Sequence, residues 1–151
     1  MLLEKSGPWL FLCYAWICVE EGRKVKEGEK ISRITDDDFS RMKKCVECGI
    51  EPTSALLQRC YPKSVNDLRL FARNFQMDTW SYDTVAMFWR EHHNHGSMRD
   101  VAKAMVCDLS DVSVQVISGS RTFFAYNIYG LQLEIGNMVY LHRDKIAEKV
   151  N

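Results

Sequence analysis

Apolar residues recur at helical spacing through most of the chain, and the spacing changes near its end. In the segment 36–48, Phe39, Met42 and Val46 share one helical face, with Thr35 placed as an N-cap and Gly49 as a left-handed C-cap. Further helices are predicted over 9–19, from Pro52 to about residue 61, from Ser64 through Phe75, from Ser81 to about Gly96, and from Ser97 through Met105.

Beyond Cys107 the apolar residues alternate with polar ones, as they do in half-buried strands. Strands are predicted around 112–116, 121–129, 131–135, 138–142 and 146–150, with turns at 118–120 and 136–137. We therefore expect an α+β protein. A helical body over residues 1–106 is followed by a small antiparallel β-barrel or curled sheet over 107–151, the two packed as one compact unit.

Composition and charge narrow the function classes. The chain has 151 residues, 46% of them hydrophobic and 26% charged, which excludes a disordered, collagen-like or coiled-coil protein. Lys and Arg together number 20, as do Asp and Glu, so no bulk positive field draws the chain to nucleic acid. The aromatic residues of the segment 121–129 can stack bases in principle, but its local charge favours core and sheet-face packing.

The cysteines and the N-terminal apolar run bear on location. The run from Trp9 to Val19 is too short to cross a membrane as a helix, which takes about 20 residues. Glu4 offsets Lys5 before it, and no small-residue cleavage site follows it, so we interpret it as a buried helix. We expect no membrane association, a cytoplasmic location and six mostly reduced cysteines.

Two clusters are candidates for metal binding. Cys45 and Cys48 form a C-x-x-C pair, and His92 and His95 share a helical face, so either pair can hold an ion such as zinc or iron. The alternative is structural. Cys45 continues the apolar face of its helix, and the histidines lie at a helix end, where the helix dipole favours imidazolium. The chain contains no P-loop, dinucleotide-binding glycine pattern or nucleophile elbow, which favours a binding protein over an enzyme.

The last part of the chain resembles the small hydrogenase-maturation chaperones. The resemblance covers residues 107–150 and rests on Gly136, Val139 and His142, with Ile-, Glu- and Lys-containing sequence after them and Cys107 before the first strand. It implies a small β-barrel in which Cys107 and His142 help to hold an iron precursor and pass it to a hydrogenase subunit.

Two hypotheses follow from these features. The first is a cytoplasmic binding or adaptor protein whose small barrel contacts a protein partner, in hydrogenase or other metalloenzyme assembly. The alternative is a metal-binding protein or metalloenzyme that uses His92 and His95 with Cys45 and Cys48. An aromatic nucleic-acid binder is a third and less favoured interpretation, because the second half of the chain is net acidic.

Overall fold

The computed structural model describes residues 6–20, 23–27, 30–92, 101–111 and 113–150. The chain divides into two compact units, Met1–Phe88 and Trp89–Asn151. The boundary expected after residue 106 therefore falls inside the second unit instead of at its start. Among the described helices, none has both the length and the apolar character needed to cross a membrane.

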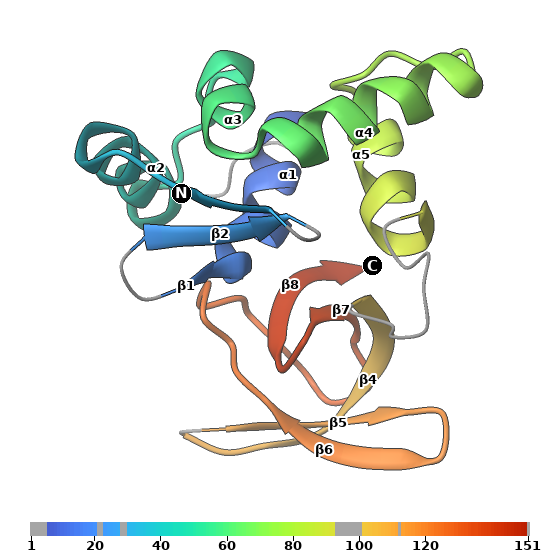
Figure 1. Cartoon of the computed structure of the whole chain (residues 1–151). Coiled ribbons are helices and arrows are strands. Elements are labelled where there is room, and N and C mark those ends of the chain that lie inside the picture. The colour runs from blue at the N-terminus through green and yellow to red at the C-terminus, as the bar shows by residue number, and fades with distance from the viewer. Residues whose placement is uncertain (1–5, 21–22, 28–29, 93–100, 112, 151) are drawn as a thin grey trace. The chain divides into compact units, whose positions relative to one another are not determined.

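The N-terminal unit combines helices with a small antiparallel sheet of order β1-β2-β3 (Figure 1). The helices of the predicted helical body are present, but no strand was predicted in this part of the chain, so the small sheet is an addition to it. The hydrophobic pattern missed it because charged residues dominate its strands, and Val25 alone supplies a fully buried apolar side chain in β2. In chain order the elements are α1 (Gly7–Ala15), the 3-10 turn η1 (Trp16–Cys18), β1 (Val19–Glu20), β2 (Lys24–Glu27), β3 (Lys30–Arg33), α2 (Asp36–Cys48), α3 (Ser54–Cys60), α4 (Pro62–Asn74) and α5 (Tyr82–Met87).

The expected caps of α2 are confirmed, whereas the start of α4 differs from the prediction. Thr35 accepts a hydrogen bond from the N–H of Asp38, and Gly49 ends the helix at a φ of 66°. α4 begins at Pro62 instead of near Ser64. Its free N–H groups are capped by the Glu27 carboxylate, which lies in β2 and cannot be found from local sequence.

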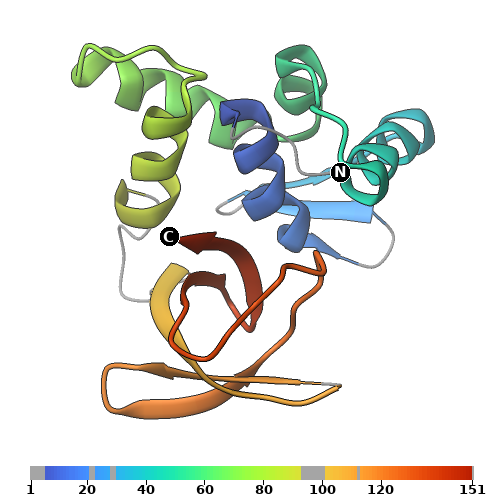
Figure 2. The ribbon, with the colours of Figure 1, turned by 180° about the vertical axis from the view of Figure 1, so that it is seen from behind.

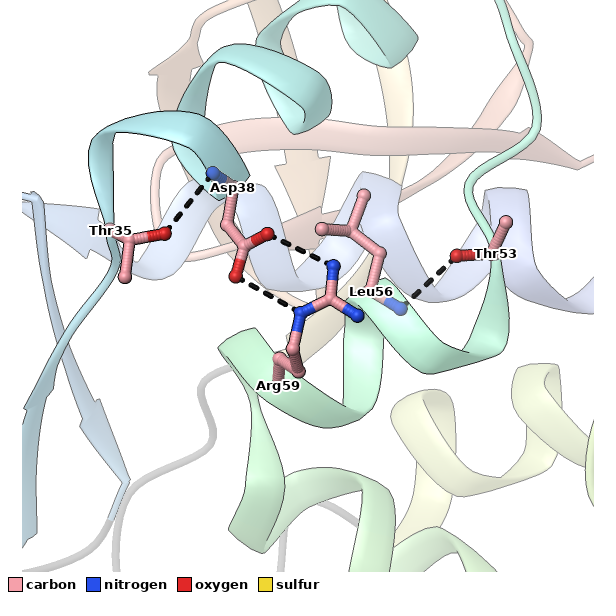
Figure 3. Close-up of polar contacts among 5 residues, drawn as sticks. All are labelled: Thr35, Asp38, Thr53, Leu56 and Arg59. Atoms are coloured by element: carbon pink, nitrogen blue, oxygen red, sulfur yellow. Dashed lines mark hydrogen bonds and ion pairs between the residues drawn. The ribbon is translucent and has the colours of Figure 1, made fainter.

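An ion pair joins α2 to α3 within this unit. Arg59 donates from Nε and Nη2 to the two carboxylate oxygens of Asp38, at 3.2 and 3.0 Å (Figure 3). The N–H of Leu56 also donates to the hydroxyl of Thr53, which caps α3 (Figure 3). The two-point hydrogen bond from Arg59 lowers the pKa of Asp38 below its ordinary value of 3.8.

We expect Asp38→Asn to lower stability at neutral pH and to lose this effect in acid. Because the pKa of Asp38 is lower in the folded chain than in the unfolded chain, the ionised carboxylate stabilises the fold above pH 3.8. This contribution disappears as the pH falls through the folded-state pKa. Urea unfolding of the wild type and the variant from pH 7 to pH 2 measures the difference. Asp37→Asn, in the same first turn, is the matched control; an equal pH dependence in both variants would contradict the role of Arg59.

The C-terminal unit is built on a five-stranded antiparallel sheet of order β6-β5-β4-β7-β8 (Figure 1). β4 is its long central strand: residues 101–105 pair with β7, and residues 105–109 pair with β5. The core of the unit gathers buried residues from all five strands, including Val116, Val139 and Ile146. The elements are the π-helical turn η3 (Phe88–His92), β4 (Val101–Leu109), β5 (Val114–Ser118), β6 (Arg121–Ala125), β7 (Met138–His142) and β8 (Lys145–Val150).

Two secondary-structure predictions in this region are wrong. The segment expected as a helix through Val101 and Met105 is strand β4, because pairing with β7 overrides the helix propensity of its Ala and Met residues. The segment 131–135 is a loop instead of a strand. Its backbone is held by side chains: Asn127 bonds both the N–H and the C=O of Leu131, and Asn137 accepts from the N–H of Glu134.

The sheet is curled, and it is not closed into the barrel that was one of the two expected forms (Figure 2). Its edges meet at one point, where an isolated parallel bridge joins Tyr126 to Lys145. There the N–H of Tyr126 donates to the backbone C=O of Asp144 at 2.8 Å, and the C=O of Tyr126 accepts from the N–H of Ile146 at 2.9 Å. Beyond this bridge, the described residues leave β6 as an open edge of the sheet.

Candidate functional site

The structure does not bring Cys107 and His142 together. In the register of β4 with β7, His142 lies opposite Val101, at the start of β4, whereas Cys107 lies six residues further along that strand. At about 3.3 Å per residue, the two side chains are separated by about 20 Å along the sheet. The pair implied by the resemblance therefore does not form one centre.

Each of these two residues has a structural role in its own place. His142 is completely buried, and its ring lies 5.6 Å from the ring of Trp89. Cys107 is half-buried at a bulge between Val106 and Asp108. Its thiol donates a hydrogen bond to the carbonyl oxygen of Gln115, at 3.3 Å. These contacts account for both side chains as parts of the sheet and its packing.

The residues of the metal hypothesis are divided between the two units. Cys45 and Cys48 lie in the last turn of α2, the first buried and the second exposed, while His92 ends η3 in the second unit. His95 lies outside the described residues. Among the residues that the structure describes, no group of three Cys, His, Asp or Glu side chains is arranged to hold a metal ion.

Burial makes the thiols of Cys45 and Cys60 poor nucleophiles. Desolvation raises the pKa of Cys60 to about 12 and also raises the pKa of Cys45. We expect iodoacetamide at pH 8 to modify the exposed Cys48 at least about tenfold faster than either of them in the native protein, because reaction requires an accessible thiolate. Peptide mass mapping over time measures the three rates.

The same labelling experiment tests the metal hypothesis. Added zinc is expected to leave the rate at Cys48 unchanged, because the structure places no third ligand beside the C-x-x-C pair in the described residues. The cysteine of an engineered zinc-finger peptide, protected on zinc addition, serves as the positive control. Protection of Cys48 by zinc would contradict the structural interpretation of the pair.

A polar cluster lies on the outer side of β7 and β8. Arg90 makes a two-point ion pair with the buried carboxylate of Glu148, and its guanidinium lies 4.6 Å from the centre of the Tyr140 ring. Beside it is a pocket of about 480 Å³. Its lining is Arg90, Glu91, Val101, Ala102, Lys103, Ser118 and Tyr140. The lining carries charges of both signs, and the Arg90 charge is already balanced by Glu148, so the pocket has no excess of one charge that would indicate a ligand.

The open edge of β6 is the more distinctive feature of this unit. β5 and β6 form a hairpin in which Ser118 pairs with Arg121 across a two-residue turn, and Gly119 supplies the positive φ of 62° at the first turn position. The pair that flanks such a turn exchanges both of its backbone hydrogen bonds, and bonded and non-bonded pairs then alternate. The backbone groups of Arg121, Phe123 and Ala125 therefore face β5.

It follows that the backbone N–H and C=O groups of Thr122 and Phe124 face away from β5. The contacts of Tyr126 confirm this alternation, because its N–H and C=O, next in the same series, bond to the start of β8. No described strand pairs with Thr122 or Phe124 on that side. We call these two residues, with their outward backbone groups, the β6 edge.

The side chains at the β6 edge are apolar and exposed. Phe124 is 64% exposed on the outer face of the sheet, and Tyr126 beyond it is 55% exposed. Ile117 lies diagonally beside Phe124, and Met105 pairs with Ile117, which extends the apolar surface across three strands. The opposite edge strand, β8, differs, because it carries the charges of Lys145 and Lys149, which discourage further strand pairing.

The sequence contained a partial indication of this edge. The aromatic residues of the segment 121–129 were predicted to pack in the core or on a sheet face, and Phe123 does pack against the core. Phe124 follows it directly, and successive side chains of a strand point to opposite faces, so one of the two had to point outward. The position of β6 at the edge of the sheet, in contrast, depends on strand order.

Comparison of the chain with protein-family models, with curated proteins and with solved structures finds no match.

Proposed function

We propose that the chain is a protein-binding module that takes up an extended segment of a partner protein at the β6 edge. The observation that carries this proposal is the row of outward backbone groups on Thr122 and Phe124, beside the exposed ring of Phe124. Strand addition uses such groups for affinity and alternate side chains for selectivity. A binding or adaptor role was also the first hypothesis from the sequence.

The edge defines the chemistry of the segment that it accepts. One face of an added strand lies beside Phe124, so an apolar or aromatic partner side chain is favoured there. Arg121, exposed at the start of β6, favours an acidic residue at the matching end of the partner segment. The turn at Gly119 and the Tyr126 bridge limit the open edge at its two ends, so the accepted segment is short.

The proposal is limited to protein binding. The resemblance implies that Cys107 and His142 together hold an iron precursor, whereas the register of β4 with β7 places them apart, so the proposal does not include this transfer. The cytoplasmic location and a role in metalloenzyme assembly stay predictions from the sequence.

Selection from a library of displayed peptides tests the proposal. With dilute wild-type protein as bait, we expect enrichment of short peptides with alternating apolar residues. Their binding is expected to fall at least about tenfold in Thr122→Pro, which removes an outward N–H that β5 does not use, and in Phe124→Lys. Phe75→Lys is the matched control, because Phe75 is an equally exposed phenylalanine on the other unit, at 58%. Enriched peptides that bind all variants alike, or no enrichment, would contradict the proposal.

A further inference from the structure

Resting on the proposed function, we infer that one occupant of the β6 edge is the β6 strand of a second copy of this chain. The two strands would pair antiparallel about Phe123, so that their sheets join into one continuous sheet. The inference follows from the edge itself, because pairing about Phe123 lets both outward-facing residues of each copy form backbone hydrogen bonds. It also brings no two charged residues of β6 opposite each other.

The backbone groups of the edge match those of a second copy. Outward N–H and C=O groups belong to Thr122 and Phe124, and antiparallel pairing about Phe123 places Thr122 of one copy opposite Phe124 of the other. Each of these residues then exchanges both of its backbone hydrogen bonds with its counterpart. Phe123 of one copy lies opposite Phe123 of the other in a non-bonded pair, where Cα atoms approach to about 4.5 Å and side chains pack most closely.

The side chains match as well. On the outer face each Thr122 meets the exposed ring of a Phe124, and a β-branched residue beside an aromatic one is a favourable cross-strand pair. On the inner face the two Phe123 rings meet beside the two cores against which they already pack. Arg121 faces Ala125 of the other copy, so no like charges meet along the strand.

Charge does not oppose the association of two copies. The formal net charge of the chain is zero, so no long-range repulsion keeps copies apart. β6 contains no lysine, proline or bulge, the usual devices that prevent edge pairing. The start of β8 is not available in the same way, because the N–H of Ile146 already donates to the C=O of Tyr126.

Sedimentation velocity over a wide concentration range tests self-pairing. We expect the weight-average mass to rise reversibly from 17.6 kDa toward twice that value. The rise should be absent in Thr122→Pro and unchanged in Phe75→Lys. A chain that stays monomeric at every concentration, or variants that associate as the wild type does, would overturn the inference.

A charge exchange tests the register itself. In the double variant Thr122→Lys with Phe124→Lys, lysines oppose lysines across the interface, so we expect a monomer. In Thr122→Glu with Phe124→Lys, each glutamate opposes a lysine of the other copy, so we expect association to return and to weaken with added salt. Equal behaviour of the two double variants would overturn pairing about Phe123.

The outcomes separate this inference from the proposed function. Monomeric wild type together with peptide binding that depends on Thr122 and Phe124 would overturn self-pairing and retain strand addition. A wild-type chain that neither dimerises nor binds peptides would overturn both self-pairing and strand addition. A concentration-dependent dimer that competes with the selected peptides supports both at one edge.

Discussion

Glu148→Ala is expected to destabilise the C-terminal unit by about 3 kcal/mol. The Glu148 side chain is 7% exposed and that of Arg90 is 20% exposed, and the two form a two-point ion pair. The alanine variant removes the carboxylate while the guanidinium stays largely buried above Tyr140. The cost of such a change lies mainly in the desolvated charge that remains, which is why it exceeds the cost of breaking a surface pair.

Amide hydrogen exchange of β7 and β8 under native conditions measures this loss in the unit concerned. Asp144→Ala is the matched control, because it breaks the exposed pair of Asp144 with Lys145 and is expected to cost less than about 1 kcal/mol. The double variant Arg90→Met with Glu148→Leu replaces both charges by apolar groups and is expected to regain most of the stability. A double variant as unstable as Glu148→Ala would show that the ion pair itself, and not an unpaired charge, sets the cost.

Features written into short stretches of sequence were predicted correctly. Thr35 and Gly49 bound α2 because capping depends on hydrogen bonds within one helical turn. The strand at 138–142 and the turn at Gly119 likewise depend on alternation and on a single positive φ. In each case the deciding interactions join residues that are close in the chain.

Features that depend on residues distant in the chain were not predicted from the sequence. The segment from Val101 is a strand because β7, more than thirty residues later, supplies its hydrogen bonds. The cap of α4 comes from Glu27, and the separation of Cys107 from His142 is a consequence of strand register. Residue spacing contains none of these facts, since a register shift leaves the spacing unchanged.

The candidate site depends partly on neighbouring residues and partly on distant ones. The adjacency of Phe123 and Phe124 required one outward ring, which the sequence shows. Whether that ring lies at the centre or at the edge of the sheet depends on strand order β6-β5-β4-β7-β8, and on the loop at 131–135 that does not form a further strand. An additional strand there would have been able to cover the β6 edge and remove the site.

Gly7→Ala is expected to destabilise the N-terminal unit by about 3 kcal/mol, at the upper end of the usual cost of overpacking. Gly7 begins α1, and a Cβ atom placed on it would lie 1.9 Å from the carbonyl oxygen of Trp80 and 2.6 Å from its carbonyl carbon. These are backbone atoms, so no rotamer change relieves the overlap. Either α1 or the chain at Trp80 has to move, and with it the contact between the rings of Phe11 and Trp80, now 5.5 Å apart.

Urea unfolding followed by tryptophan fluorescence measures the effect, with Gly119→Ala as the matched control. A Cβ atom at Gly119 meets no atom within 4 Å, so its cost is only that of a left-handed φ of 62°, about 1 kcal/mol. The comparison separates steric overlap from backbone strain, because Gly7 is not among the glycines with positive φ. Equal losses in the two variants would mean that α1 moves away from Trp80 at little cost, and that the close approach of the two segments does not hold the helix in place.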